Sequence, residues 1–226
     1  MNNRGVTIAF LGDSVTQGCF EFCKKNKDVY TVFDKNSAYH NYIAKIFSIL
    51  FPTVPVNIIN AGISGGTCKH GLERIERDVL QHNPDLTVVC FGLNDVKEGI
   101  AGLKEYTSAL EKIFCKLKQA GSEIIFMTPN MMNTNISPYL EKKEYISIAK
   151  VCKKIQCEGV MDAYMEAAKD ICYKNNVVVC DCYSKWKVMK EIGIDTTELL
   201  ANKINHPTRE MNWLFAIMLV DIMIEK

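Results

Sequence analysis

The sequence has no long apolar run and no excess of charge of either sign. A helix that crosses a bilayer needs about 18 apolar residues, and no segment approaches that length. The 27 basic and 26 acidic side chains nearly cancel, so no overall field attracts nucleic acid or an anionic membrane surface. Residues 1–5 lead straight into a short apolar run, without the pattern of a signal peptide. We expect a cytoplasmic protein that acts on a small molecule and has no nucleic-acid or membrane partner.

The motifs of metal and cofactor sites are also missing. The ten cysteines include close pairs such as Cys180 and Cys182, but they lack the repeated Cys-x-x-Cys spacing of a structural zinc site. A disulfide scaffold belongs to short secreted chains, so we expect reduced thiols. No Gly-x-Gly-x-x-Gly and no Walker sequence follows the first apolar run, and such motifs cradle the phosphates of nucleotides. We expect neither a metal nor a cofactor.

Proline is scarce, with 6 residues, whereas hydrophobic residues make up 48% of the chain. This balance is typical of a globular protein and excludes intrinsic disorder as the dominant state. A length of 226 residues suits one α/β domain with a well-buried core and is short for two domains. We therefore expect a single domain that spans residues 1–226.

Strand-like and helix-like segments alternate along the chain. Buried parallel strands are indicated by five short runs that are rich in Val, Ile and Phe: residues 6–11, 56–60, 86–91, 124–128 and 177–181. Helical periodicity is found at residues 39–50, 68–81, 103–120, 159–175 and 209–224. This alternation predicts a doubly wound α/β fold, a flavodoxin-like three-layer sandwich with a five-stranded parallel sheet.

Two segments without a clear period interrupt this alternation. Residues 19–37 follow the first strand and have the aromatic and charged composition of an excursion such as a hairpin. Residues 130–138 follow the fourth strand and are irregular. Open α/β sheets bind their ligands at the carboxyl ends of the strands, so both segments are candidate walls of a binding pocket.

The first strand ends in Gly12-Asp13-Ser14. A serine in a tight turn at a strand exit is held rigidly at the carboxyl edge of the sheet, where a nucleophile can attack a carbonyl carbon. The tripeptide is weak support by itself, because Asp and Ser also occur in ordinary turns, where they cap backbone amides.

Three later segments give this turn its significance. The second strand exits through Asn60-Ala61-Gly62-Ile63-Ser64-Gly65-Gly66-Thr67, the third through Gly92-Leu93-Asn94-Asp95, and Ile204-Asn205-His206-Pro207 lies near the C-terminus. Together with the first turn, these blocks resemble those of the SGNH hydrolases, also called GDSL esterases. The blocks stand in the order of that family and span almost the whole chain.

The resemblance implies a role for each block. Ser14 is expected to be the nucleophile, and His206 the base that takes its proton and returns it to the leaving alcohol. The oxyanion donors implied are the backbone amides of Ser14 and Gly62 and the side-chain amide of Asn94. Asp13 is expected to support its loop by binding backbone amides. Gly62 and Asn94 also fit simple turn positions.

One position departs from the pattern of the family. Family members usually have an Asp three residues before the His, and this chain has Lys203, which cannot accept a hydrogen bond. Three outcomes are open: a Ser14–His206 dyad whose imidazole is oriented by a backbone carbonyl, an acid from elsewhere, or weakened catalysis. Possible acids are Asp181, Asp195 and Glu198. We favour the dyad.

A second serine is a rival nucleophile. Gly62-Ile63-Ser64-Gly65-Gly66 matches the Gly-x-Ser-x-Gly elbow of α/β-hydrolases, which also joins a strand to a helix. The chain has no oxyanion loop of the His-Gly-Gly-Gly type, and a nucleophilic Ser64 leaves the turns around Ser14 and Asn94 without a function. We therefore rank Ser64 below Ser14.

The sequence thus predicts a serine esterase that hydrolyses a carboxylic ester through an acyl-enzyme. The substrates of the family include acetylated sugars, short-chain esters, thioesters and lysophospholipids, and the resemblance does not choose among them. Our first hypothesis is an acetyl group on a carbohydrate, because no membrane-binding face or long apolar lid is evident. The alternative class is a ligand-binding module on the same fold, with catalysis weakened by the missing acid. The sequence does not predict an oligomeric state.

Overall fold

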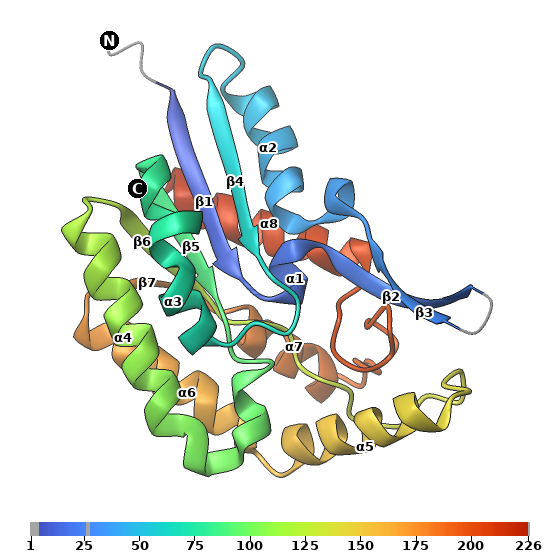
Figure 1. The fold of residues 1–226 in the computed structure, drawn as a ribbon. Coiled ribbons are helices and arrows are strands. Elements are labelled where there is room, and N and C mark those ends of the chain that lie inside the picture. Colours follow the sequence, from blue (N-terminus) through green and yellow to red (C-terminus); the bar gives the residue numbers. More distant parts are fainter. Residues whose placement is uncertain (1–4, 26–27, 226) are drawn as a thin grey trace.

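The computed structural model describes residues 5–25 and 28–225. In this part of the chain, the central sheet has five parallel strands in the order β4-β1-β5-β6-β7 (Figure 1). The strands are β1 (Val6–Gly12), β4 (Val56–Gly62), β5 (Leu86–Cys90), β6 (Glu123–Met127) and β7 (Val178–Cys180). Each one lies within one or two residues of an apolar run identified in the sequence. The predicted α/β fold and its five-stranded parallel sheet are confirmed.

The register of the strands brings three of the sequence blocks to one edge. Gly12, at the end of β1, pairs with Gly62 of β4 on one side and with Cys90 of β5 on the other. The chain therefore leaves these strands at the same height. The interior of β1 is fully buried from Ile8 to Leu11, so helices cover both faces of the sheet.

Two helical layers sandwich the sheet (Figure 1). On one face, α2 (Tyr39–Leu50) packs against α8 (Arg209–Ile224). On the other face, α3 (Cys68–Asp78) packs against α4 (Leu103–Gln119), which also contacts α6 (Val160–Lys174). All five match predicted segments. None of the helices that the structure describes is both long and apolar enough to cross a bilayer.

The segment that follows β1 forms the expected hairpin. Its strands β2 (Cys19–Lys25) and β3 (Asp28–Phe33) are antiparallel and project from the sheet beside the segment that precedes α8 (Figure 1). Arg209, the first residue of α8, ties the hairpin down by pairing with Glu21 and Asp34. The last helix and the hairpin are therefore held together.

Among the described residues, three α-helices were not among the predicted segments: α1 (Ser14–Gln17), α5 (Lys143–Cys157) and α7 (Cys182–Glu191). The last of these begins directly after β7, and Asp181, which the sequence assigned to the strand, accepts a hydrogen bond from the Ser184 amide as the N-cap. A strand that is followed by a helix without a loop leaves no turn residues to mark the boundary.

Candidate active site

Ser14 lies where β1 turns into the short helix α1. Asp13 caps this helix by accepting a hydrogen bond from the Val15 amide at 3.0 Å. The turn requires glycine at position 12, because a Cβ there would lie 2.0 Å from Thr16 Oγ1. Ser14 is only 4% exposed and is the first residue of the helix, where backbone N–H groups point outward without intrahelical partners.

His206 lies in a loop whose backbone is organised by one side chain. Asn202 Oδ1 accepts hydrogen bonds from the amides of Ile204, Asn205 and His206, at 3.0, 2.9 and 2.9 Å. Lys203 adopts a left-handed conformation with φ of 58°, which closes this tight turn. These hydrogen bonds fix the backbone of the loop that carries the imidazole. His206 itself is buried, with 5% of its surface exposed.

The irregular segment after β6 supports the same loop from the other side. Asn130 Nδ2 donates to the Asn205 carbonyl at 2.9 Å, and the Asn133 amide donates to the Ile204 carbonyl at 2.8 Å. Both asparagines are buried. The segment, which the sequence identified as a candidate pocket wall, therefore also holds the loop that carries the histidine.

Both nitrogens of the His206 ring have partners. Nε2 lies 2.9 Å from Ser14 Oγ, and Nδ1 lies 3.0 Å from the Phe20 carbonyl oxygen. A carbonyl oxygen only accepts, so Nδ1 carries the hydrogen of the neutral ring and Nε2 is left to accept from the serine hydroxyl. Burial lowers the pKa of His206, the bond to the Phe20 carbonyl opposes this effect, and the charge of Lys97 adds to it.

The Phe20 carbonyl is itself held in place. The Arg209 guanidinium lies over the Phe20 ring, 4.4 Å from its centroid, while it pairs with the carboxylates of Glu21 and Asp34. Arg209 follows His206 closely in sequence. One side chain therefore fixes the hairpin, and with it the acceptor for His206 Nδ1, relative to the loop that carries the imidazole.

Asn94 faces the turn of Ser14 from the end of β5. Its Nδ2 donates to the Gly66 carbonyl at 3.0 Å and lies 3.4 Å from Asp13 Oδ2, while its Oδ1 accepts from Lys97 Nζ at 2.9 Å. The lysine thus fixes which end of the amide is the donor. Burial raises the pKa of Asp13 to about 7, an effect that the Val15 amide opposes and Asp95 increases.

The sequence model of the GDSL-like Lipase/Acylhydrolase family matches residues 10–214, a stretch that contains Ser14, Asn94 and His206. The chain belongs to this family. An acetylxylan esterase from Geobacillus stearothermophilus is 26% identical over 186 residues, which cover 78% of this chain and 76% of that protein. An arylesterase from Vibrio mimicus is 38% identical over 72 residues, which cover 32% of this chain and 36% of that protein. The protein is therefore a carboxylic-ester hydrolase of the GDSL type.

Solved structures share the fold. The structure of the Geobacillus acetylxylan esterase matches with a TM-score of 0.71 at 22% identity and covers 96% of this chain and 93% of its own. A two-domain esterase active on acetylated mannans matches with a TM-score of 0.70 at 19% identity, over 98% of this chain and 49% of its own. At these identities, the similarity shows the fold alone.

Variants of the Geobacillus enzyme described as catalytic mutants replace one serine, one aspartate or one histidine by alanine, and the aspartate lies three positions before the histidine. In this GDSL-like hydrolase, Lys203 stands three positions before His206. Its ammonium group bonds Glu198 Oε2 at 2.9 Å. The other acids considered are also engaged elsewhere: Asp181 caps α7, and Asp195 bonds Asn135. The partner found on His206 Nδ1 is the Phe20 carbonyl.

The structure distinguishes between Gly62, the last residue of β4, and Gly65, in the loop that follows. The Gly62 amide, expected to be an oxyanion donor, donates to Asn60 Oδ1 at 2.9 Å and so is not free. A Cβ at Gly62 would lie 2.3 Å from the Gln17 amide nitrogen, so this glycine allows α1 to approach β4. Gly65, with φ of 75°, has open space around it, and its amide has no hydrogen-bond partner within the described residues. The sequence alone does not say which amide is free.

Ser64, the rival nucleophile, has different surroundings. It is exposed, its amide donates to Gln17 Oε1 at 2.7 Å, and its side chain interacts with the Cys19 thiol, whose pKa burial raises to about 11. His70, in the first turn of α3, accepts a hydrogen bond from the Thr67 amide through Nδ1. In the described part of the chain, Ser64 has no hydrogen bond to a histidine.

Proposed function

We propose that this hydrolase cleaves a carboxylic ester with Ser14 as nucleophile and His206 as general base. The observation that carries the proposal is the pair of bonds to the imidazole, at 2.9 Å from Ser14 Oγ and 3.0 Å from the Phe20 carbonyl. The second bond sets the tautomer that can accept the serine proton. A hydroxyl that donates to a neutral imidazole is poised to attack a carbonyl carbon.

The reaction proceeds in two stages. In the first, Ser14 Oγ bonds the ester carbonyl carbon while its proton moves to His206 Nε2, and the tetrahedral intermediate collapses when Nε2 returns that proton to the leaving alkoxide. In the second, a water loses a proton to Nε2 and attacks the acyl-serine, and the acid leaves as Ser14 regains its proton. The Phe20 carbonyl accepts the Nδ1 hydrogen throughout.

The proposed mechanism needs hydrogen-bond donors for the oxyanion of the tetrahedral intermediate. We assign them to the Ser14 amide, the Gly65 amide and Asn94 Nδ2. The Gly65 amide replaces that of Gly62, which is occupied by Asn60, and Asn94 Nδ2 would exchange its bond to the Gly66 carbonyl for one to the oxyanion. Lys97 supports this assignment, since its ammonium group bonds Asn94 Oδ1 at 2.9 Å and so leaves Nδ2 as the donor end of the amide. Its positive charge also favours a nearby oxyanion.

For the substrate, we propose an acetyl ester of a carbohydrate. The support is the likeness to the Geobacillus esterase, which is named for acetylxylan, over three quarters of both chains. The burial of Ser14 and His206 is consistent with a short acyl group, because a long chain needs an apolar channel to the nucleophile.

A fluorophosphonate probe tests the nucleophile. We expect a stoichiometric adduct on Ser14, located by peptide mass spectrometry, and its loss in Ser14→Ala. An adduct on Ser64 transfers the proposal to the rival serine. Absence of any adduct on folded protein favours the ligand-binding module. Turnover of p-nitrophenyl acetate and octanoate then tests the acyl group, and a preference for octanoate contradicts the acetyl assignment.

A further inference from the structure

A cavity of about 340 Å³ lies beside the loop that carries His206 and has no part in the chemistry described so far. Its walls come from three places: residues 21–22 of the hairpin, residues 139–142 and Tyr145 before and within α5, and residues 201–203 of the loop that carries His206. We infer that this cavity, called here the alcohol subsite, binds the leaving alcohol of the ester and that this alcohol is a sugar ring. The inference rests on the proposed function.

The position of the cavity relative to His206 assigns it to the alcohol. The Phe22 ring forms part of its wall, lies 6.0 Å from the imidazole centroid and stacks on the Tyr145 ring at 4.9 Å. His206 Nε2 must protonate the leaving oxygen, so the alcohol leaves the tetrahedral carbon on the side of the imidazole. The oxyanion donors at Asn94 and Gly65 come from other strand ends.

The lining of the cavity has the chemistry that recognises a sugar. Tyr139 provides an exposed aromatic ring, which can pack against the C–H groups of a pyranose ring, and the Phe22 and Tyr145 rings, stacked on each other, add apolar lining. Glu141 and Lys142 put charges of both signs on the rim, where they can bond hydroxyl groups as acceptor and donor. A fatty alcohol or lipid chain would instead strip water from these charged groups without replacing their hydrogen bonds.

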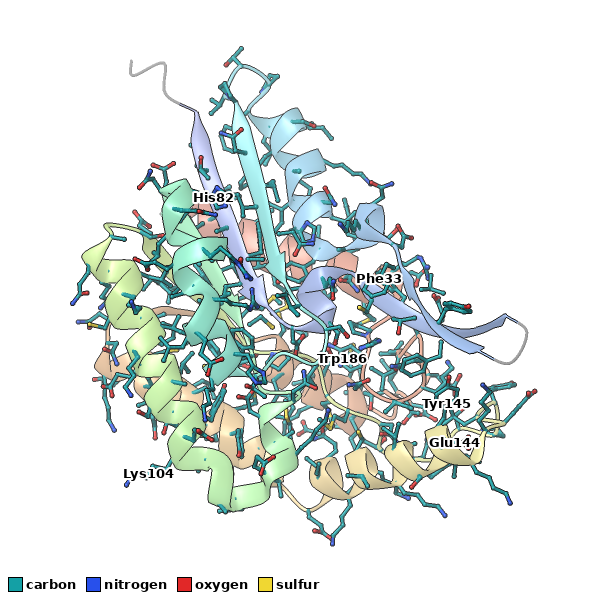
Figure 2. The ribbon with its side chains drawn as sticks, in the orientation of Figure 1. Phe33, His82, Lys104, Glu144, Tyr145 and Trp186 are labelled. Carbon is teal, nitrogen blue, oxygen red and sulfur yellow. The ribbon has the colours of Figure 1, made fainter. Side chains whose placement is uncertain are left out.

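Two further features fit a hydroxyl-bearing ligand of limited size. The Tyr145 hydroxyl is shielded from solvent and has no hydrogen-bond partner in the described part of the chain. Figure 2 shows Tyr145 near the start of α5, below the projecting hairpin, and Tyr139 at the rim is 74% exposed. The volume is at the lower end of the range of small-molecule pockets, which favours one or two sugar rings over a polymer segment.

Tyr139→Ala tests the alcohol subsite without disturbing the core. The two substrates are xylose tetraacetate, whose leaving group is a sugar, and ethyl acetate, whose leaving group is too small to fill the cavity. We expect the ratio of kcat/KM for the sugar ester to that for ethyl acetate to fall about 3- to 10-fold, the equivalent of one aromatic contact. Most of this change is expected in KM for the sugar ester.

The matched control is Tyr173→Ala, which removes an 86% exposed tyrosine from α6 and should leave the ratio unchanged. If Tyr139→Ala also leaves the ratio unchanged, or if Tyr173→Ala lowers it equally, the subsite is refuted. Ser14→Ala in the same assays separates this outcome from failure of the proposed function, because hydrolysis that persists in Ser14→Ala refutes the dyad whatever the ratio does.

Discussion

Ser14 and Ser64 occupy similar places in the chain but very different places in the chemistry. Each follows a parallel strand at the carboxyl edge of the sheet, inside a motif associated with nucleophilic serines. Ser14 is buried and has His206 at 2.9 Å, whereas Ser64 is exposed and interacts with a buried thiol. The comparison teaches that a nucleophile is defined by the partner that the fold brings to it from a distant segment, and not by the local tripeptide.

The largest expected effect comes from removing each hydroxyl in turn. Ser14→Ala should lower kcat for p-nitrophenyl acetate by ~10⁴-fold or more, since losing the nucleophile of a serine hydrolase has an effect of this order. Ser64→Ala should change it by less than about 3-fold, as is usual for a surface hydroxyl outside the reaction path. Circular dichroism checks that both variants fold. Equal losses in the two variants would break the comparison.

A second difference between the two serines is that the side-chain amide of Asn94 faces the turn of Ser14. Asn94→Ala should lower kcat by about 100- to 1,000-fold, with a small change in KM, because an oxyanion donor acts mainly in the transition state. Asn57→Ala, which changes an exposed asparagine of β4, is the control. A loss confined to KM would assign Asn94 to substrate binding.

The third prediction concerns the loop that brings the imidazole to Ser14. Asn202→Ala removes the acceptor of three backbone amides and should lower kcat/KM by about 10- to 100-fold, since small misplacements of a reacting group are costly. Asn202→Asp keeps the acceptor and should restore most of the activity. If both variants lose activity equally, the amide acceptor is not what positions His206.

A smaller effect is expected on the pH profile. Because the pKa of His206 is lowered, the acid limb of kcat/KM should lie below pH 6.5, the value of an unperturbed imidazole. The charge of Lys97 disfavours the protonated ring, so Lys97→Met should raise the pKa and move the limb upward. Lys104→Met changes an exposed lysine at the start of α4 (Figure 2) that does not contribute to the pKa shift of His206, and it should not move the limb. A downward shift in Lys97→Met would contradict this assignment.

The smallest expected effect tests whether the missing acid matters. Lys203→Asp places a carboxylate at the position that the Geobacillus enzyme gives to aspartate, in a left-handed conformation that Asp tolerates. Because the Phe20 carbonyl already accepts the Nδ1 hydrogen, kcat/KM should change by less than about 3-fold, against ~10⁴-fold for the acid of a full triad. A gain of about tenfold or more would show that the imidazole had exchanged its partner.

The parts of the fold that repeat a simple pattern were predictable from the sequence. Buried strands appear in the sequence as uniform apolar runs. In amphipathic helices such as α2, apolar residues recur with a period of 3.6 residues. The helix α7 was missed because it follows β7 without a turn. The blocks around Ser14 and His206 were recognisable because their residue types and order are distinctive.

The rest of the site leaves little trace in the sequence. The Phe20 carbonyl is a backbone atom in an aperiodic hairpin, so no residue type marks it. Gly62 ends β4 and Gly65 lies only three residues later, and only the hydrogen bond from Gly62 to Asn60 shows which amide is occupied. Lys97 stands three positions after Asn94 on an irregular helical segment, and its bond to the amide oxygen depends on that local path.

The acceptor on His206 Nδ1 has a consequence for how this site can vary. Every residue type has the same carbonyl group, so no single substitution at position 20 removes the oxygen itself, and only displacement of the hairpin can withdraw it. A carbonyl is also neutral, so the positive charge that forms on the ring during turnover gains no counter-ion from this partner. In the proposed mechanism, the site therefore gives up some transition-state stabilisation but has an orienting group that a point mutation cannot delete.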